Sequence, residues 1–327
     1  MKKNRIRSLG FVFGVLYLCA VWVAAAPQTV CVGGHTVGMK VQLEGLLVSS
    51  VEEQSAAQKA GLRNGDRILQ INGIPIKAPE ELIRLTAEKR ELVLKVERNG
   101  STREISVIPE ETDGSIRLGI GVQSELTGIG TITYYDPETG QYGALGHGIC
   151  GGTKGQLYEI TGGILVPSVV TGVIPSKSGT AGQLEGSFQP EVTIGTIRAN
   201  TKQGVFGTAF SDADTCVPVA DPSEIEIGEA TLLSNVEGDT VGEYQIRIIR
   251  KLTDFTDSGR DLLLVITDEE LLNKTGGIVQ GMSGSPILQN GKLIGAVTHV
   301  LVNAPNYGYG ITIGKMLHSA DKAFLAA

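Results

Sequence analysis

The chain has 327 residues, a net charge of −7 and 44 glycines. Its length is enough for about two domains, and it has no block of basic residues beyond the N-terminus that would favour nucleic-acid binding. The glycine content is nearly twice the usual ~7%. Because the glycines lie between runs rich in Val, Ile and Thr, the composition predicts a mainly β protein with many tight turns.

Residues 1–30 predict a membrane anchor. A basic start at residues 2–7 precedes the uncharged run Leu9–Ala26, which is long enough to span a hydrocarbon core and longer than a usual signal-peptide apolar stretch. The basic flank stays in the cytoplasm, so the rest of the chain is expected outside it. Ala24–Ala26 resembles a cleavage site, but Pro27 disfavours cleavage. We therefore expect an uncleaved single-pass anchor, with its removal left open.

The exported part contains three cysteines, Cys31, Cys150 and Cys216. A bridge between Cys150 and Cys216 is compatible with an oxidising compartment, but spacing does not establish it. His147 and Cys150 form an H-x-x-C pair that lacks a second ligand pair nearby. We therefore expect no metal site and no cofactor.

Residues 31–109 predict a small α+β domain. The stretch AGLRNGDRILQING, Ala60–Gly73, resembles the A-G-L-x-x-G-D-x-I-L-x-I-N-G signature of bacterial PDZ modules. Asn72-Gly73 suits a tight hairpin turn, and Pro79 begins a predicted helix that continues to about Lys89. Two further strands flank Asn99-Gly100 as a second hairpin. The resemblance predicts a PDZ domain.

PDZ domains add an extended peptide as a strand and receive its terminal carboxylate in a loop of backbone amides. The candidate for this loop is the segment before the predicted strand at 40–43. Its proposed peptide-binding residues are Gly34, Val37, Gly38 and Met39. The alternative is that its glycines only turn the chain. The expected ligands are peptide C-termini.

The segment Gly281–Pro286, GMSGSP, predicts a serine nucleophile in an oxyanion hole. It resembles the G-x-S-G-G/S-P box of chymotrypsin-like peptidases. In that box the first glycine and the serine donate the two amides, which are Gly281 and Ser283 here. The alternative is a glycine-rich hairpin without catalytic function.

His147 is the candidate general base. Two predicted strands, 129–135 and 141–145, form a hairpin that leads directly to it, and glycines on both sides leave room for substrate. The alternative is a surface turn histidine. His299 is a rival base that follows the serine box along a strand, whereas His318 in a helix-like segment is expected to be structural.

A third residue should be an acid that orients the imidazole. The sequence alone does not select it, and its candidates include Asp212, Asp214, Asp254, Asp257, Asp261 and Asp268. For Asp268 there is a structural alternative, because Thr267-Asp268-Glu269-Glu270 fits a helix capping box with Thr267 as the cap.

The anchor, the PDZ signature, GALGHGI at 143–149 and TGGIVQGMSGSPI at 275–287 together resemble the stage IV sporulation protein B peptidases of endospore-forming bacteria. The resemblance covers essentially the whole chain. It implies His147 as base, Ser283 as nucleophile and Asp268 as acid, in a chymotrypsin-like, β-barrel-type peptidase domain at 110–327. Met282 replaces the aspartate of trypsin-like zymogens, which excludes that activation route. The late position of the acid leaves the topology open.

The expected function is that of an exported, membrane-tethered serine endopeptidase. The resemblance implies a membrane-embedded regulator of a sigma-factor-processing protease as substrate, self-cleavage near the N-terminus, and a location between the two membranes around the forespore. The main alternative is a catalytically inactive PDZ scaffold that binds peptide tails. A periplasmic quality-control protease ranks third, since those usually place the protease before the PDZ domain. The scissile sequence, the PDZ ligand and the oligomeric state are not predicted.

Overall fold

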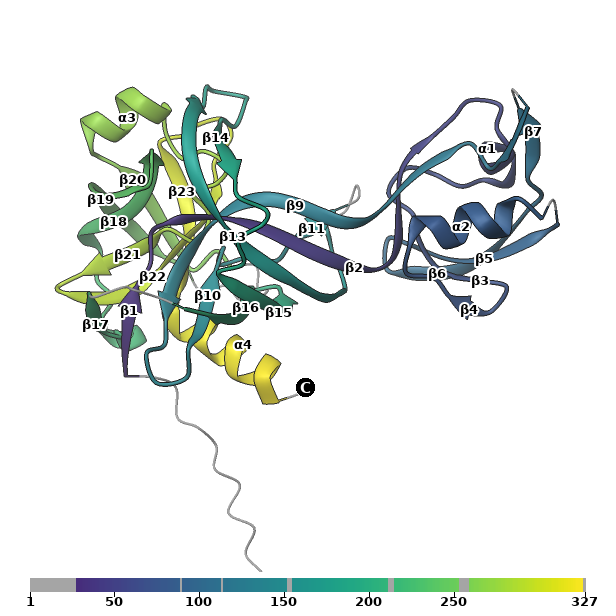
Figure 1. Cartoon of the computed structure of the whole chain (residues 1–327). Helices are drawn as coiled ribbons and strands as arrows, with labels where there is room; N and C mark the ends of the chain where they lie inside the picture. The colour runs from purple at the N-terminus through teal and green to yellow at the C-terminus, as the bar shows by residue number, and fades with distance from the viewer. Residues whose placement is uncertain are drawn as a thin grey trace, which may run out of the picture.

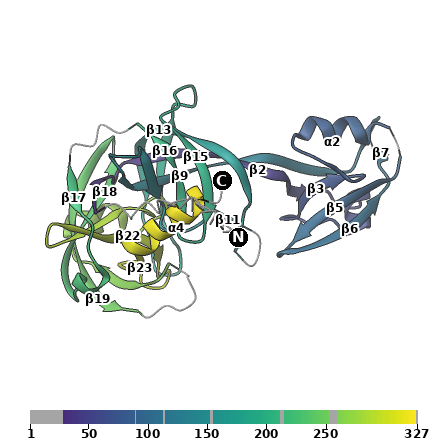
Figure 2. The same cartoon turned by 90° about the horizontal axis from the view of Figure 1, so that it is seen from below.

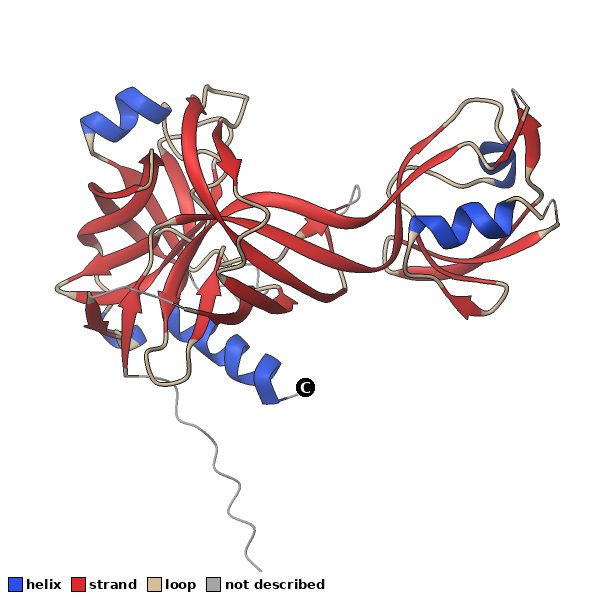
Figure 3. Cartoon of the chain, in the orientation of Figure 1, coloured by secondary structure: helices blue, strands red, loops and turns tan. Residues whose placement is uncertain are grey.

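The computed structural model of the protein describes residues 28–88, 90–112, 114–151, 155–210, 215–252 and 259–325 (Figure 1). The expected anchor lies almost entirely outside these residues. The fold is mainly β, as predicted, with strands dominating both the large body and the outlying domain (Figure 3). None of the helices in the described part of the chain is both long and apolar enough to cross a membrane.

The large body contains two lobes. In the first, antiparallel pairings form a ring of strands in the order β2 (Thr36–Val51), β9 (Ile120–Tyr135), β10 (Gln141–Ala144), β16 (Gly204–Ala209), β15 (Gly195–Thr201) and β13 (Ile160–Ile174). Three more strands extend this sheet: β1 (Thr29–Val32), β14 (Gln183–Phe188) and β17 (Cys216–Pro218). Its interior is filled by large side chains, among them Ile132, Tyr142 and Leu165.

The second lobe is a closed six-stranded barrel. Its strand order is β18 (Gly228–Glu237), β19 (Thr240–Lys251), β20 (Leu262–Ile266), β23 (Tyr307–Thr312), β22 (Lys292–Val300) and β21 (Pro286–Gln289). Alternate residues of these strands, such as Ile246 and Ile248 on β19, point inward and are fully buried. Three helices accompany the strands: the 3-10 turn η1 (Pro222–Glu224), α3 (Glu269–Thr275) and α4 (Ile313–Leu325).

The PDZ domain is inserted between β2 and β9 and lies apart from the large body (Figures 1 and 2). It contains α1 (Ala56–Ala60), β3 (Arg67–Ile71), β4 (Ile74–Pro75), α2 (Pro79–Thr86), β5 (Leu92–Arg98) and β6 (Ser101–Val107). Asn72-Gly73 and Asn99-Gly100 all have positive φ, as their hairpin turns require. Two short strand pairs complete the strands of the described residues: β7 (Glu110–Thr112) with β8 (Ser115–Arg117), and β11 (Cys150–Gly151) with β12 (Gln156–Leu157).

The expected boundary at residue 31 differs from the structure, because β2 belongs to both parts. Its first half pairs with β9 and β13 in the first lobe, with Met39 opposite Gly128 and Leu165. Its second half, from Leu46, pairs with β3 in the PDZ core. The PDZ core therefore begins about fifteen residues later than the expected boundary (46 − 31 = 15), and β1 with the start of β2 belongs to the peptidase. It also continues past the expected end at residue 109, to Leu118 and Val122.

The same finding corrects the proposed PDZ carboxylate loop. Gly34, Val37, Gly38 and Met39 all lie in the peptidase lobe: the Gly34 carbonyl accepts from the amide of Asn235, and Val37 pairs with β9 and β13. A Cβ on Gly38 would come within 2.6 Å of both Phe188 and Val166. Gly38 is therefore explained by close packing between strands rather than by ligand binding.

The disulfide joins Cys31 to Cys216, whereas Cys150 is a free, exposed thiol. The structure therefore lacks the Cys150–Cys216 bridge that the sequence left open. Cys31 and Cys216 are register partners on β1 and β17, a proximity created by a pairing across 185 residues that short-range spacing cannot indicate.

A bridge that closes so long a loop should stabilise the fold mainly by restricting the unfolded chain. We expect Cys31→Ala/Cys216→Ala to lower the free energy of unfolding by about 2–5 kcal/mol, measured by urea unfolding of the oxidised proteins. Cys150→Ala is the matched control, since its side chain is exposed and unpaired. Equal stability of the double variant and the oxidised parent would contradict the assignment.

Candidate active site

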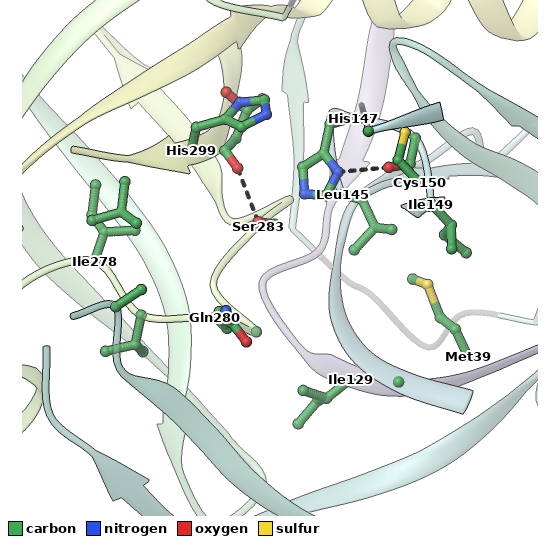
Figure 4. Close-up of a pocket in the computed structure, with 18 of the residues that line it drawn as sticks. Met39, Ile129, Leu145, His147, Ile149, Cys150, Ile278, Gln280, Ser283 and His299 are labelled. Atoms are coloured by element: carbon green, nitrogen blue, oxygen red, sulfur yellow. Dashed lines mark hydrogen bonds between the residues drawn. The ribbon is translucent and has the colours of Figure 1, made fainter. Parts of the chain in front are cut away.

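A cavity of about 1070 Å³ opens between the two lobes, and it contains His147, Ser283 and His299 (Figure 4). One wall comes from β2 and β9 and includes Met39 and Ile129. The opposite wall comes from the second barrel, through the segments 278–283 and 298–302. The sequence-predicted base and nucleophile, which are far apart along the chain, thus face the same space.

The backbone of the serine loop requires glycine at two positions. Gly281 and Gly284 have φ values of 100° and 96°, which side chains with a Cβ rarely adopt. A Cβ on Gly284 would also lie 2.1 Å from the carbonyl oxygen of Thr131. Met282 is fully buried, so the position that differs from trypsin-like zymogens serves as a core side chain.

Strand β9 of the first lobe holds the serine loop by hydrogen bonds to the backbone carbonyl groups of that loop. The Thr131 amide donates to the Ser283 carbonyl oxygen at 3.1 Å. The Thr131 hydroxyl donates to the Gly281 oxygen at 2.7 Å, and the Thr133 hydroxyl to the Gly284 oxygen at 2.7 Å. Both threonine side chains are fully buried. The carbonyls of the loop are therefore directed to β9.

The two amides expected to form the oxyanion hole remain unoccupied by protein acceptors. Within the described ranges, neither the Gly281 nor the Ser283 N–H donates to a protein acceptor, whereas the neighbouring Gly284 and Ser285 amides both do. Free amides next to a nucleophile are what an oxyanion hole requires.

His147 follows β10 after a turn in which Leu145 and Gly146 both have positive φ. Its Nδ1 lies 3.0 Å from the Gly148 carbonyl oxygen. Because a carbonyl only accepts, Nδ1 carries the proton, and Nε2 is the atom with a free lone pair. Burial lowers the pKa of His147 below its ordinary value, outweighing the opposing effect of this hydrogen bond. The ring is thus a neutral base at neutral pH.

Ser283 does not bond to His147 in this structure. Its Oγ donates to the Thr298 carbonyl at 3.0 Å. His299, the rival base, lies in the same cavity, with its ring centroid 5.2 Å from that of His147. Burial, His147 and Arg260 together lower the pKa of His299 to about 4. Figure 4 shows the two imidazoles flanking Ser283, so both remain candidate bases on proximity alone.

Asp268 is not among the residues that line the cavity. It is the N-cap of α3: one carboxylate oxygen accepts from the Leu271 amide at 2.9 Å, and the other from the Gln245 amide at 3.2 Å. The structure therefore supports the capping alternative, with Asp268 itself, not Thr267, as the cap. It does not bring Asp268 to the imidazole, whose ring hydrogen bond goes to Gly148.

No carboxylate lines the cavity within the part of the chain that the structure describes. Asp261 is buried, but it bonds to Thr312 and Lys315 beside α4. The other named candidates, Asp212, Asp214, Asp254 and Asp257, fall outside the described residues. The third member of a triad is thus not assigned by this geometry.

Sequence reasoning missed the residues that support the nucleophile. Thr131, Thr133 and Thr298 contact the serine loop or its strand, yet no motif marks them. The available signal was weak: two threonines two positions apart in an apolar strand place two hydroxyls on one buried face.

Comparison with known families identifies both parts of the chain. A model described as SpoIVB peptidase S55 matches residues 114–317, and a PDZ-domain model matches residues 47–98. The first match covers more than half of the chain, which therefore belongs to the SpoIVB peptidase S55 family and carries a PDZ domain. It is a serine peptidase by this membership.

Similarity to individual proteins is more limited. A putative zinc metalloprotease of Rhizobium meliloti is 34% identical over 26% of this chain and 23% of its own length. The regulator of sigma-E protease RseP of Escherichia coli is 37% identical over 23% of this chain and 17% of its own. The chain thus spans less than a quarter of these curated relatives.

Two solved structures share partial likeness. The PDZ domain of an SdrC-like protein from Listeria monocytogenes is 21% identical and covers 25% of this chain and 90% of its own, with a TM-score of 0.23. The inactive form of the Rv3671c protease is 14% identical. The match covers 60% of this chain and 84% of the protease chain, with a TM-score of 0.32.

Substitution of Asp268 separates a capping role from a catalytic one. As a cap, Asp268→Ala should lower stability by about 1 kcal/mol. Asp268→Asn should lower it less, because the amide oxygen still accepts from Leu271 while the amide nitrogen cannot accept from Gln245. Both variants should keep the rate at which a fluorophosphonate labels Ser283 within about threefold of the parent. Loss of an orienting acid costs about 10⁴-fold in well-studied triads, so a drop of that size in Asp268→Asn would restore Asp268 to the triad.

Proposed function

We propose that this member of the SpoIVB peptidase family is an exported, membrane-tethered serine endopeptidase in which Ser283 is the nucleophile and His147 the general base. One observation carries the proposal. Ser283, His147 and the free amides of Gly281 and Ser283 surround a single cavity between the lobes. Nucleophile, base and oxyanion donors are the three groups that acyl transfer requires.

The chemistry begins with rotation of the Ser283 hydroxyl from the Thr298 carbonyl towards Nε2 of His147. The imidazole takes the hydroxyl proton while Oγ attacks the peptide carbonyl carbon, and the resulting oxyanion accepts from the Gly281 and Ser283 amides. Collapse breaks the C–N bond, and the imidazolium gives its proton to the leaving amine. Water, deprotonated by the same imidazole, then hydrolyses the acyl-enzyme and regenerates Ser283.

The substrate is a protein in extended form. The cavity walls are largely apolar, whereas Lys202 and Arg260 supply cationic groups at exposed positions. Resemblance and family membership support a regulatory membrane protein in sporulation signalling as the substrate, a membrane-embedded regulator of a sigma-factor-processing protease, together with self-cleavage near the N-terminus. The PDZ domain binds peptide tails and so delivers substrate to the cavity.

Export across a membrane is supported by two features. The basic start and the apolar run Leu9–Ala26 fit an anchor with the catalytic part outside the cytoplasm. The Cys31–Cys216 disulfide fits an oxidising compartment. The proposed location is the membrane, with the peptidase in the space around the forespore.

A second candidate function is a catalytically inactive PDZ scaffold. Two observations favour it: the Ser283 hydroxyl bonds to the Thr298 carbonyl rather than to an imidazole, and Asp268 caps α3. The free amides of Gly281 and Ser283 and the free lone pair on Nε2 of His147 favour the peptidase instead.

Labelling with a fluorophosphonate distinguishes the two functions, because only an activated serine reacts rapidly. We expect the parent protein to be labelled and Ser283→Ala to show none. His147→Ala should react at least about 10³-fold more slowly. Ser285→Ala, which removes a buried hydroxyl of the same loop, controls for site specificity. A folded parent protein that resists labelling would establish the scaffold.

The pH dependence of the labelling rate identifies the base. A base must be neutral to accept the serine proton, and burial lowers the pKa of His147, so the neutral form persists below its ordinary titration range. The labelling rate should therefore fall to half its plateau at a pH below about 6.5. His299→Gln should retain this acid limb. A midpoint above 6.5, or loss of the limb in His299→Gln, would contradict His147 as the base.

A further inference from the structure

Strand β9 has one unpaired edge that runs from the PDZ domain to the active-site cavity. Along residues 120–131, β9 pairs with β2 on one side. On its other side, β10 pairs only with residues 132–135. No described strand pairs with that second side over residues 120–129, and none of these ten residues is buried. Such an edge presents a row of free backbone groups to an incoming chain.

The hydrogen bonds at Thr131 and Ser124 show which backbone groups face this edge. The Thr131 amide donates to Ser283, and its carbonyl accepts from Leu145, so both groups point away from β2. The Ser124 carbonyl points to β2, where it accepts from the Gln42 side chain at 3.0 Å. Because backbone directions alternate along a strand, the odd-numbered residues from Gly121 to Ile129 present their N–H and C=O to the open edge.

The two ends of the edge lie at two different sites. At one end, Ile120 and Val122 pack into the PDZ core with Leu82 and Leu85 of α2, and β9 is preceded by Gly119 at a φ of 74°. At the other end, residues 126–129 line the cavity of Ser283 and His147. Ten residues at about 3.3 Å each make a track of about 30 Å between them.

We propose that this edge binds one continuous substrate tail, so that the PDZ domain measures where the chain is cut. The occupant is an extended peptide C-terminus that pairs antiparallel to β9 along residues 120–129. Its terminal carboxylate lies at the start of β9, and its upstream residues reach Ser283. The scissile bond is therefore about ten residues from the C-terminus. This inference rests on the proposed peptidase function.

The direction of the peptide follows from the fold. A PDZ domain adds its ligand as a strand, and a loop of backbone amides receives the terminal carboxylate. The turn at Gly119 directly precedes β9, so an antiparallel tail has its C-terminus there and extends towards Ile129. Cleavage near Ser283 therefore releases the C-terminal fragment of the substrate, which is the part that the PDZ domain binds.

Binding is tested without catalysis by using the full-length Ser283→Ala variant. The probe is a displayed library of random 14-residue peptides with free C-termini, from which the tightest binder is resynthesised. We expect shortening it from fourteen to five residues to weaken binding at least tenfold, and amidation of its carboxylate to weaken it similarly. A five-residue peptide that binds as tightly as the full one would overturn the track.

Backbone methylation tests strand pairing directly. N-methylation of single residues in the ten-residue tail should weaken binding at least tenfold at alternate positions and less than threefold at the positions between, because only alternate N–H groups face β9. On the protein, Thr127→Pro removes one edge N–H, whereas Thr127→Ala keeps it. The proline variant should bind at least tenfold more weakly than the alanine variant. Uniform effects along the peptide, or equal binding by the two variants, would contradict the pairing.

The parent enzyme tests the measuring function with the same peptide. We expect cleavage eight to twelve residues before the C-terminus, and a four-residue insertion between this bond and the C-terminus should move the cut by four residues in the sequence. Cleavage that follows the local sequence instead would overturn the measurement. Fluorophosphonate labelling separates the two claims. If the protein resists labelling but binds the peptide in a length-dependent way, the result supports the track along β9 and refutes the peptidase function. If the protein is labelled but its binding does not depend on peptide length, the result refutes the track alone.

Discussion

The site depends on hydrogen bonds from two buried threonines of β9 to the carbonyl groups of the serine loop. Thr131 and Thr133 of β9 bond the carbonyls of Gly281, Ser283 and Gly284 from the opposite lobe. A buried carbonyl without a partner costs about 1–3 kcal/mol, so three such bonds strongly favour one orientation of the loop. That orientation leaves the Gly281 and Ser283 amides free beside the nucleophile. The oxyanion hole is thus built by contact between lobes.

The same strand links the two parts of the molecule. Residues 120–122 of β9 contribute to the PDZ core, residues 126–129 line the cavity, and Thr131 holds the nucleophile loop. Strand β2 pairs with β9 from Ile120 to Thr131, so the connection is a paired ribbon rather than a flexible linker. In the proposed binding mode, a ligand at the PDZ end therefore lies on the same strand that orients Ser283.

Local patterns predicted local structure well, and failed where distant segments meet. The PDZ signature, the glycines of the serine box and the hairpin before His147 each specify backbone conformation within a few residues, and the fold agrees with them. The sharing of β2 between two parts, the Cys31–Cys216 pairing and the threonine contacts of β9 depend on segments far apart in the chain. Asp268 shows a further limit, because a carboxylate at a helix start has the same sequence appearance in a cap and in a triad.

A crystal structure of the fluorophosphonate adduct of the protein tests the oxyanion hole most directly. We expect a covalent bond from phosphorus to Ser283 Oγ, and a phosphonyl oxygen about 2.7–3.1 Å from the Gly281 and Ser283 amides. His147 Nε2 should lie within hydrogen-bond reach of the adduct, with Thr131 still bonded to the loop carbonyls. An adduct whose phosphonyl oxygen faces solvent, or a serine loop released from β9, would contradict this oxyanion hole.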